Sequence, residues 1–166
     1  MIEVNVERET DLSAAVVWEE IRHFDRVLKW IPGGETSSIE VKGEGVGAVR
    51  DIHLSTQGYV QHRLVAFDPE QRSFSYTLTA GKPIGMQDYV VVASVTPKDR
   101  GGCVIRWFGR MTADTSLDEQ VVGAALAVAL GNMTSGVVAR LKGQQPVFSS
   151  QPNEDWQLRQ STSRHQ

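Results

Sequence analysis

The sequence predicts an α+β domain in which a curved, seven-stranded antiparallel sheet wraps around one long helix near the C-terminus. Three observations favour this fold class. Six runs with strand-like alternation follow one another between residues 38 and 112, separated by turns rich in Gly, Pro and Asp. A long apolar segment of helical periodicity comes after them. At 166 residues, the chain suits one domain with a sizeable core.

The N-terminal residues predict one strand and two short helices. Residues 1–9, MIEVNVERE, alternate as an opening strand. Residues 12–24 carry apolar side chains at helical spacing, namely Val16, Val17, Ile21 and Phe24, and DRVLKW adds a further short turn. Pro32 and the two glycines after it end this segment.

From residue 38 onward, the sequence predicts strand after strand. The connecting segments KGEGVG, STQG, FDPEQ, GKPIGM and PKDRGG are typical of turns. Spacing of this kind indicates an antiparallel meander. The expected strands lie at about 38–42, 47–54, 58–67, 72–80, 87–96 and 102–112.

The last predicted element is a helix from Ser116 to Lys142, ended by Gly143. Ser116 and Glu119 have the spacing of a capping box. Small residues one turn apart allow close backbone approach along one side: Gly123, Ala127, Gly131 and Ser135. A helix this apolar is expected to be buried. Its apolar stripe consists of Val122, Leu126, Leu130, Met133, Val137 and Leu141.

The C-terminal segment is polar and rich in Gln and Ser. It contains only scattered large apolar residues, Val147, Phe148 and Trp156. We therefore expect one folded domain over residues 1–143 and a disordered tail over residues 144–166.

Composition and charge limit the partners. The formal net charge of −3 argues against a broad basic surface for nucleic acid. The single cysteine, Cys103, excludes an intramolecular disulfide. The N-terminus lacks the basic and apolar regions of a secretory signal, and the longest uninterrupted apolar run is too short to span a bilayer. We expect a cytoplasmic protein; a homodimer is left open.

Two kinds of site have no support in the sequence. GEGVGA at residues 43–48 matches a dinucleotide-binding pattern, but it leads into a strand rather than a helix. The four histidines lack the spacing of metal ligands. We therefore expect neither a metal nor another cofactor.

Polar side chains at inward-facing positions of two strands are the main functional signal. His62 shares the parity of Val60 and Leu64, and Arg50 shares that of Ile52. If Ser55 faces Tyr59, Arg50 and His62 become diagonal neighbours on one face. The same reasoning sets His62, Leu78 and Tyr89 in one row across three strands.

Two interpretations of His62 stay open. A lone inward histidine can be a core residue that is hydrogen-bonded to a neighbour, or it can belong to a polar patch within a pocket. Arg50 favours the pocket, because a guanidinium is rarely buried without a polar or anionic partner.

Several segments resemble the SRPBCC superfamily, the START-like, birch-pollen-allergen-type helix-grip group that includes polyketide cyclases, dehydrases and plant abscisic-acid receptors. The resemblance covers about residues 1–143 and rests on VWEEIRHFDRVLKWIP, GVGAVRDIHL, HRLVAFDPEQRSFSYTL and DYVVVASVTP. It implies an apolar cavity between the sheet and the final helix. In the receptor pattern, HRL at 62–64 matches a ligand-facing segment, and residues 80–86 align with a mobile loop that is a candidate lid.

The expected cavity residues follow from strand parity together with this resemblance. They are Trp30, Ile52, Leu54, Val60, Leu64, Tyr76, Leu78, Val91, Met133 and Val137. The last sheet strand is ambiguous. The resemblance points Arg106 and Phe108 inward, whereas plain parity favours Ile105 and Trp107.

Three functions are compatible with the inward polar residues and the expected cavity. The first is an enzyme that cyclises or dehydrates a polyketide-like substrate. In it, His62 would act as acid or base, Arg50 would stabilise an oxyanion and Tyr89 would donate a hydrogen bond. The second is a non-catalytic carrier or sensor of a hydrophobic small molecule. The third is a protein-interaction module.

Overall fold

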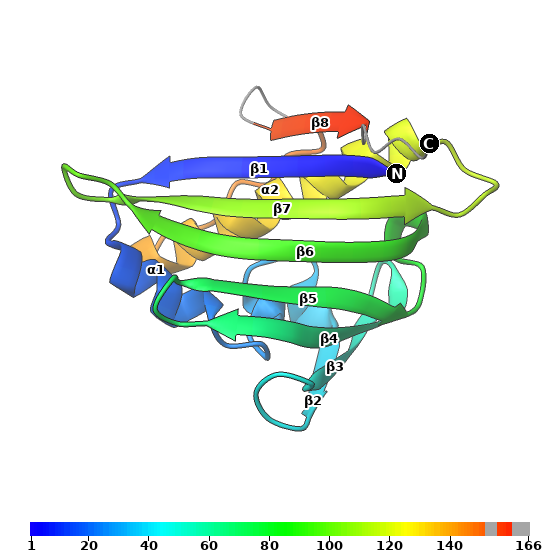
Figure 1. The fold of residues 1–166 in the computed structure, drawn as a ribbon, viewed down its shortest axis with the longest axis horizontal. Helices are drawn as coiled ribbons and strands as arrows, with labels where there is room; N and C mark the ends of the chain where they lie inside the picture. The colour runs from blue at the N-terminus through cyan, green and yellow to red at the C-terminus, as the bar shows by residue number, and fades with distance from the viewer. Residues whose placement is uncertain (152–155, 161–166) are drawn as a thin grey trace, which may run out of the picture.

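The chain forms one antiparallel sheet with both α-helices on the same side of it (Figure 1). The structure is a computed structural model, and it describes residues 1–151 and the backbone of residues 156–160. The helical elements are α1 (Ala14–Ile21), η1 (Val27–Lys29), η2 (Gly34–Thr36), η3 (Pro83–Gly85) and α2 (Glu119–Lys142). The strands are β1 (Ile2–Thr10), β2 (Ser38–Lys42), β3 (Val49–Leu54), β4 (Gly58–Asp68), β5 (Ser73–Ala80), β6 (Met86–Pro97), β7 (Cys103–Ala113) and β8 (Trp156–Gln160).

The strand order is β2-β3-β4-β5-β6-β7-β1-β8. Strands β2 to β7 are a meander in which each strand pairs with the next, and β1 pairs with β7. The predicted helix-grip architecture is therefore confirmed: the seven antiparallel strands β1 to β7, short helices after β1 and the long helix α2, with β8 added beside β1. All six strands expected between residues 38 and 112 are present, with ends shifted by at most two residues.

Helix α1 is shorter than the sequence predicts, and the difference affects the site. It begins after Ser13, whose hydroxyl accepts a hydrogen bond from the amide of Val16. It ends at Ile21, so Phe24 lies in the linker before η1 rather than on the helix. There the carbonyl of Phe24 accepts a hydrogen bond from the guanidinium of Arg50 at 3.1 Å.

Helix α2 begins at a different cap from the one expected. Asp118 is the N-cap residue, and its carboxylate accepts a hydrogen bond from the amide of Gln120 at 2.8 Å. Ser116 instead donates its hydroxyl proton to Asp114. The carboxylate of Asp118, at the N-terminus of α2, also interacts favourably with the helix dipole. The predicted stop is confirmed, since Gly143 adopts the left-handed conformation with φ of 66°.

The face of α2 toward the sheet is apolar, as predicted. Its stripe residues from Val122 to Val137 are buried. The helix is long and apolar enough to cross a membrane, but 67% of its most apolar window is buried inside the fold, as in a core helix. The closest backbone approach is at Gly136, where a Cβ atom would lie 1.8 Å from the carbonyl oxygen of Trp30. Gly136 therefore lets η1 pack directly on α2.

The register of the β3–β4 hairpin differs from the expected one by two residues. Arg50 pairs directly with His62, and Ile52 pairs with Val60. The loop consists of residues 55–57, and Gly58 closes it with φ of 76°. Glycine adopts this left-handed conformation without steric cost, so the chain can turn into β4 at this position. The two polar side chains are therefore direct neighbours rather than diagonal ones.

Further along β4, a bulge between Leu64 and Ala66 reverses the side-chain direction. Ala66 is exposed, whereas Phe67 turns inward and pairs with Phe74. The pairing of His62 with Leu78 is as expected. The pairing of β5 with β6 ends at Thr77 and Val90, one residue short of Leu78.

Strand β7 follows plain parity. Ile105 and Trp107 are 0% and 1% exposed. Arg106 points outward and donates a hydrogen bond to the side chain of Asn5. The inward orientation of Arg106 that the resemblance suggested is therefore wrong.

Part of the segment after Gly143 contacts the body of the fold. The side chain of Asn132 on α2 exchanges two hydrogen bonds with the backbone of Ser149, at 2.8 and 2.9 Å. Strand β8 pairs with β1 from Ile2 to Val6 and supplies partners to backbone groups at the edge of the sheet. The domain boundary at residue 143 stays a prediction.

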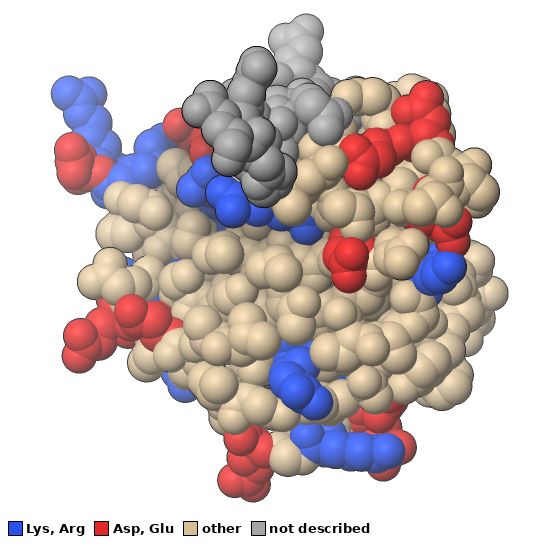
Figure 2. Space-filling model, turned by 45° about the vertical axis from the view of Figure 1, so that its right-hand side comes forward, with Lys and Arg blue, Asp and Glu red and all other residues tan. Residues whose placement is uncertain are grey.

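Charged side chains of both signs are scattered over the surface. Figure 2 shows this on one face, which has a largely uncharged area at its centre. Ion pairs between exposed side chains include Lys98 with Glu9 and Arg106 with Glu7. Such exposed pairs contribute little to stability.

Candidate ligand site

An apolar cavity of about 160 Å³, called here the inner cavity, lies between the inner face of the sheet and α2. Strands β3 to β6 supply one wall, α2 supplies another, and η1 and η3 contribute at the edges. Eight of the residues expected at the site line it: Arg50, Ile52, Leu54, Val60, His62, Tyr76, Tyr89 and Met133.

The other five expected residues lie outside the inner cavity. Val91 and Val137 belong to the buried core cluster and do not line the inner cavity. Leu78 is half-buried, and Leu64 faces a different pocket. Trp30 is buried, and its indole nitrogen donates a hydrogen bond to Glu20 at 2.8 Å.

Several lining residues were not expected from the sequence. They come from η1 and the residues after it, from the β3–β4 loop, from the segment around η3 and from α2: Val27, Ile31, Gln57, Pro83, Ile84, Met86, Leu126, Ala129 and Leu130. Two signals could have identified some of them. Leu126 and Leu130 belong to the predicted apolar stripe of α2, and residues 80–86 were already a candidate lid. The amide of Ile84 is held by the side chain of Gln57 at 3.1 Å, which ties this segment to the β3–β4 loop.

Arg50 is the charged group of the site, and it is only 3% exposed. Its guanidinium carbon lies 4.2 Å from the centre of the Phe24 ring and 4.5 Å from that of Tyr76. Both rings offer a favourable cation–π interaction. Its Nε donates to Nδ1 of His62 at 3.1 Å, and Nη1 donates to the carbonyl of Phe24. In the described part of the chain, no carboxylate forms an ion pair with Arg50.

The contact with Arg50 fixes the hydrogen-bonding role of His62. Since the guanidinium can only donate, Nδ1 of His62 must accept, and the proton of the neutral ring is on Nε2. Burial, and secondly the charge of Arg50, hold the pKa of His62 well below its usual value of 6.5. His62 is therefore a neutral hydrogen-bond donor in this structure.

Two buried polar atoms at the inner cavity lack a hydrogen-bond partner among the described residues: Nε2 of His62 and the hydroxyl of Tyr89. Burial, followed by the neighbouring Tyr76, raises the pKa of Tyr89 well above 10, so the hydroxyl keeps its proton. The rings of His62 and Tyr76 are 4.7 Å apart, and those of His62 and Tyr89 are 6.5 Å apart. Buried polar groups without partners are rare in folded proteins. Their position at a cavity suggests that a ligand satisfies them.

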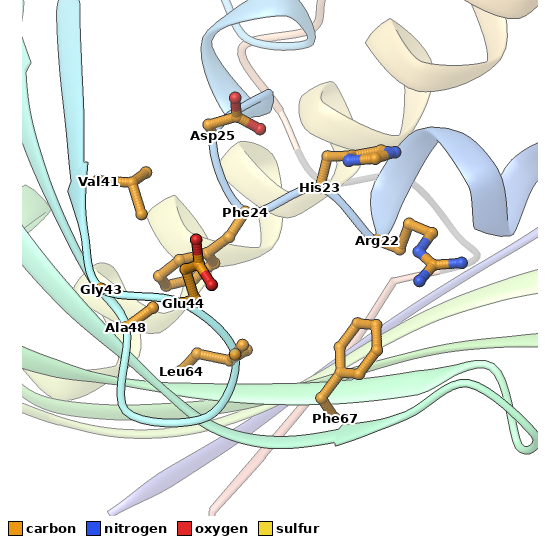
Figure 3. A pocket seen from close by; sticks show the side chains of 11 residues that line it. Arg22, His23, Phe24, Asp25, Val41, Gly43, Glu44, Ala48, Leu64 and Phe67 are labelled. Atoms are coloured by element: carbon orange, nitrogen blue, oxygen red, sulfur yellow. The ribbon is translucent and has the colours of Figure 1, made fainter.

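A second, wider pocket of about 640 Å³, called here the outer pocket, lies near the β2–β3 loop (Figure 3). Residues 22–25 form one side, and Glu44, Leu64 and Phe67 lie across from them. Phe24 lines the outer pocket and also covers the guanidinium of Arg50, which lines the inner cavity. The Phe24 ring thus stands between the outer pocket and Arg50.

Comparisons with known proteins agree with this geometry. The helix-grip fold recurs in norcoclaurine synthase from Thalictrum flavum, with a TM-score of 0.66, 18% identity, and coverage of 86% of this chain and 87% of that one. It also recurs in the protein XoxI from Bacillus cereus, with a TM-score of 0.66, 21% identity, and coverage of 86% and 95%. An uncharacterised protein from Bacillus thuringiensis gives a TM-score of 0.64 at 20% identity, with coverage of 85% and 97%.

The sequence itself matches the family described as "Polyketide cyclase / dehydrase and lipid transport" over residues 1–144. The chain therefore belongs to this family, and with it to the SRPBCC superfamily. No curated protein matches the chain.

Proposed function

We propose that the protein binds a hydrophobic or aromatic small molecule in the inner cavity. The observation that carries this proposal is an apolar cavity with two buried, unpartnered polar atoms at its wall, His62 Nε2 and the Tyr89 hydroxyl. Ligand sites commonly combine an apolar lining with a few polar groups that fix orientation. The family description, which names cyclases, dehydrases and lipid transport, supports the same class of ligand.

A substitution that fills the edge of the inner cavity tests the proposal. Ala129 lines the inner cavity from an exposed position on α2, so Ala129→Phe adds bulk there without disturbing the packed core. Binding of ethylbenzene and indole, measured by calorimetry, should weaken roughly tenfold or more because the larger ring clashes with the ligand. Val121→Phe is the matched control, since Val121 is 66% exposed on the same helix and away from the cavity. Equal binding by both variants would place the ligand elsewhere.

The second candidate function is catalysis of cyclisation or dehydration of a polyketide-like substrate. Arg50, His62 and Tyr89 would donate hydrogen bonds to an enolate oxygen as negative charge develops on it. The family description and this set of donors favour the candidate. A non-catalytic carrier or sensor would use the same donors only to orient its ligand.

The acid/base role of His62 is part of this second candidate. To accept a proton at Nε2, the ring must move its own proton to Nδ1 and give up the hydrogen bond from Arg50. His62→Gln separates the two roles, because an amide can donate a hydrogen bond but cannot transfer a proton at neutral pH. With a poly-β-ketone substrate mimic, turnover should fall about 10²-fold if His62 is the acid or base. Turnover within a few-fold of the parent would assign His62 as a donor, and a parent without turnover would favour the carrier or sensor.

A further inference from the structure

The charge at the inner cavity is unbalanced. The guanidinium of Arg50 is almost fully buried, and its contacts are two aromatic rings, an imidazole nitrogen and one backbone carbonyl. All of these partners are neutral, and a guanidinium keeps its charge in proteins. Removing such a charge from water without a counter-ion is strongly unfavourable. An anion in the cavity would offset part of that cost.

The unpartnered atoms next to Arg50 are suited to the same kind of group. Nε2 of His62 carries a proton because Nδ1 accepts from Arg50, so this nitrogen can only donate. The hydroxyl of Tyr89, whose ring lies 6.1 Å from that of Tyr76, is buried without a hydrogen-bond partner among the described residues and can donate as well. Guanidinium, imidazole N–H and phenol O–H together form a set of donors. Its natural complement is a group with several acceptor oxygens and a negative charge.

The rest of the cavity wall limits the size and the polarity of the remainder of the ligand. Apart from Gln57 and the hydroxyl-bearing Tyr76, the other lining residues are apolar, among them Ile52, Ile84 and Leu130. The volume of about 160 Å³ is close to that of an engineered protein cavity of about 150 Å³ that holds benzene. A ligand with one aromatic ring therefore matches this space, whereas a multi-ring compound requires the cavity to enlarge.

We propose that the ligand is an apolar carboxylic acid with a body of about one aromatic ring, whose carboxylate accepts hydrogen bonds from Arg50, His62 Nε2 and Tyr89. This inference rests on the proposed ligand-binding function and specifies its ligand class. It explains why Arg50 and His62 both face inward, because each supplies a hydrogen-bond donor to the carboxylate. An apolar ligand of the same shape would leave these donors without an acceptor.

Three probes of similar size test the ligand class: phenylacetate, phenylacetamide and ethylbenzene. Calorimetry at neutral pH on the full chain should give at least tenfold tighter binding of phenylacetate than of either uncharged probe. The amide is the strict comparison, because it retains a carbonyl acceptor but lacks the charge and presents N–H donors to a site composed of donors.

Arg50→Met tests the residue on which the proposal depends. Met keeps an apolar stem but no charge, so the preference for phenylacetate over ethylbenzene should fall by roughly tenfold or more. Arg50→Lys keeps the charge and should retain part of that preference, which makes it the substitute variant if Arg50→Met fails to fold. Arg63→Gln is the matched control, since Arg63 lies on the same strand but is exposed on the opposite face. It should bind all three probes like the parent.

The outcomes separate this inference from the proposed function. Binding of ethylbenzene without a preference for phenylacetate would overturn the carboxylic-acid ligand and leave the apolar site in place. A preference that persists in Arg50→Met, or that is equally lost in Arg63→Gln, would also overturn it. Failure of all three probes to bind would overturn both the ligand class and the proposed function.

Discussion

The buried imidazole of His62 should make the stability of the protein depend on pH. In the unfolded chain, His62 takes up a proton as the pH falls through about 6.5. In the folded chain, burial and the charge of Arg50 hold its pKa well below that value, so it stays neutral to a lower pH. Below pH 6.5 the unfolded state therefore binds more protons, and the free energy of unfolding decreases as the pH falls toward the folded-state pKa.

We expect His62→Gln to remove this contribution. Urea denaturation of the parent at about pH 7.5 and about pH 5.5 should give a lower free energy of unfolding at the lower pH. The decrease should be smaller in His62→Gln, because glutamine does not titrate. Other carboxylates and histidines contribute equally to both chains, so the comparison isolates His62. An identical decrease in the two proteins would mean that the buried ring does not resist protonation.

The alternation of single residues was enough to predict that Arg50 and His62 face inward. Their direct pairing was not predictable, because it depends on where the hairpin loop begins and ends. The residues STQG are compatible with more than one loop length. In the structure the loop consists of residues 55–57, and the left-handed Gly58 begins β4. The tautomer of His62 could not be predicted from the sequence either, because it depends on the hydrogen bond from Arg50 Nε to His62 Nδ1.

Among the secondary-structure elements, the strands were predicted more accurately than the helix ends. The alternation of β5 and β6 and the turns between the strands were strong signals. The bulge in β4 after Leu64 was missed because Val65, Ala66 and Phe67 are all apolar, so the sequence does not show which of them turns inward. Strand β8 was not predicted, because the segment that contains it is rich in Gln and Ser.

The segment after Gly143 should stabilise the fold through Asn132. The side chain of Asn132 is 7% exposed, and it exchanges two hydrogen bonds with the backbone of Ser149. Truncation after Gly143 removes both partners and the pairing of β8. We expect the truncated chain to lose about 1–3 kcal/mol of unfolding free energy, in contrast to the unchanged stability that a disordered tail implies.

A double-mutant cycle attributes this loss to the Asn132 contact. Asn132→Ala should destabilise the full chain but have a much smaller effect in the truncated one, because the partner backbone is already absent there. Chemical denaturation of the four proteins gives the coupling energy. Truncation that changes the unfolding free energy by less than about 0.5 kcal/mol would instead support a tail without a structural role.

The molecule as a whole combines a densely packed region with one that surrounds a cavity. β1, β6 and β7 pair along most of their length, and their inward side chains, such as Val4, Val91 and Trp107, are at most 1% exposed. The inner cavity lies on the same face of the sheet, toward β3, β4, η1 and η3. Figure 1 shows β3 and β4 at the end of the strand order away from β1 and β7. Family membership predicted this division in outline, but a fold that serves many functions cannot specify the ligand.

This division predicts where a bound ligand alters local stability. The segment around η3 has few backbone hydrogen bonds, among them Gly85 to Lys82, yet Pro83 and Ile84 line the inner cavity. Segments of this kind open at low free-energy cost, and ligand contacts raise that cost. Hydrogen exchange followed by mass spectrometry, with ethylbenzene or phenylacetate present, should slow at residues 83–89 and 27–31.

Exchange in β1 and β7 should stay unchanged by the ligand, because these strands are fully paired and lie away from the cavity. Ala129→Phe provides the control, since a plugged cavity should show no ligand-dependent slowing at all. If slowing instead appears at residues 22–25 and 43–48 while residues 83–89 exchange as before, the ligand occupies the outer pocket. Because Phe24 stands between that pocket and Arg50, the same data would then assign the Phe24 ring as the barrier that keeps the ligand away from the buried donors.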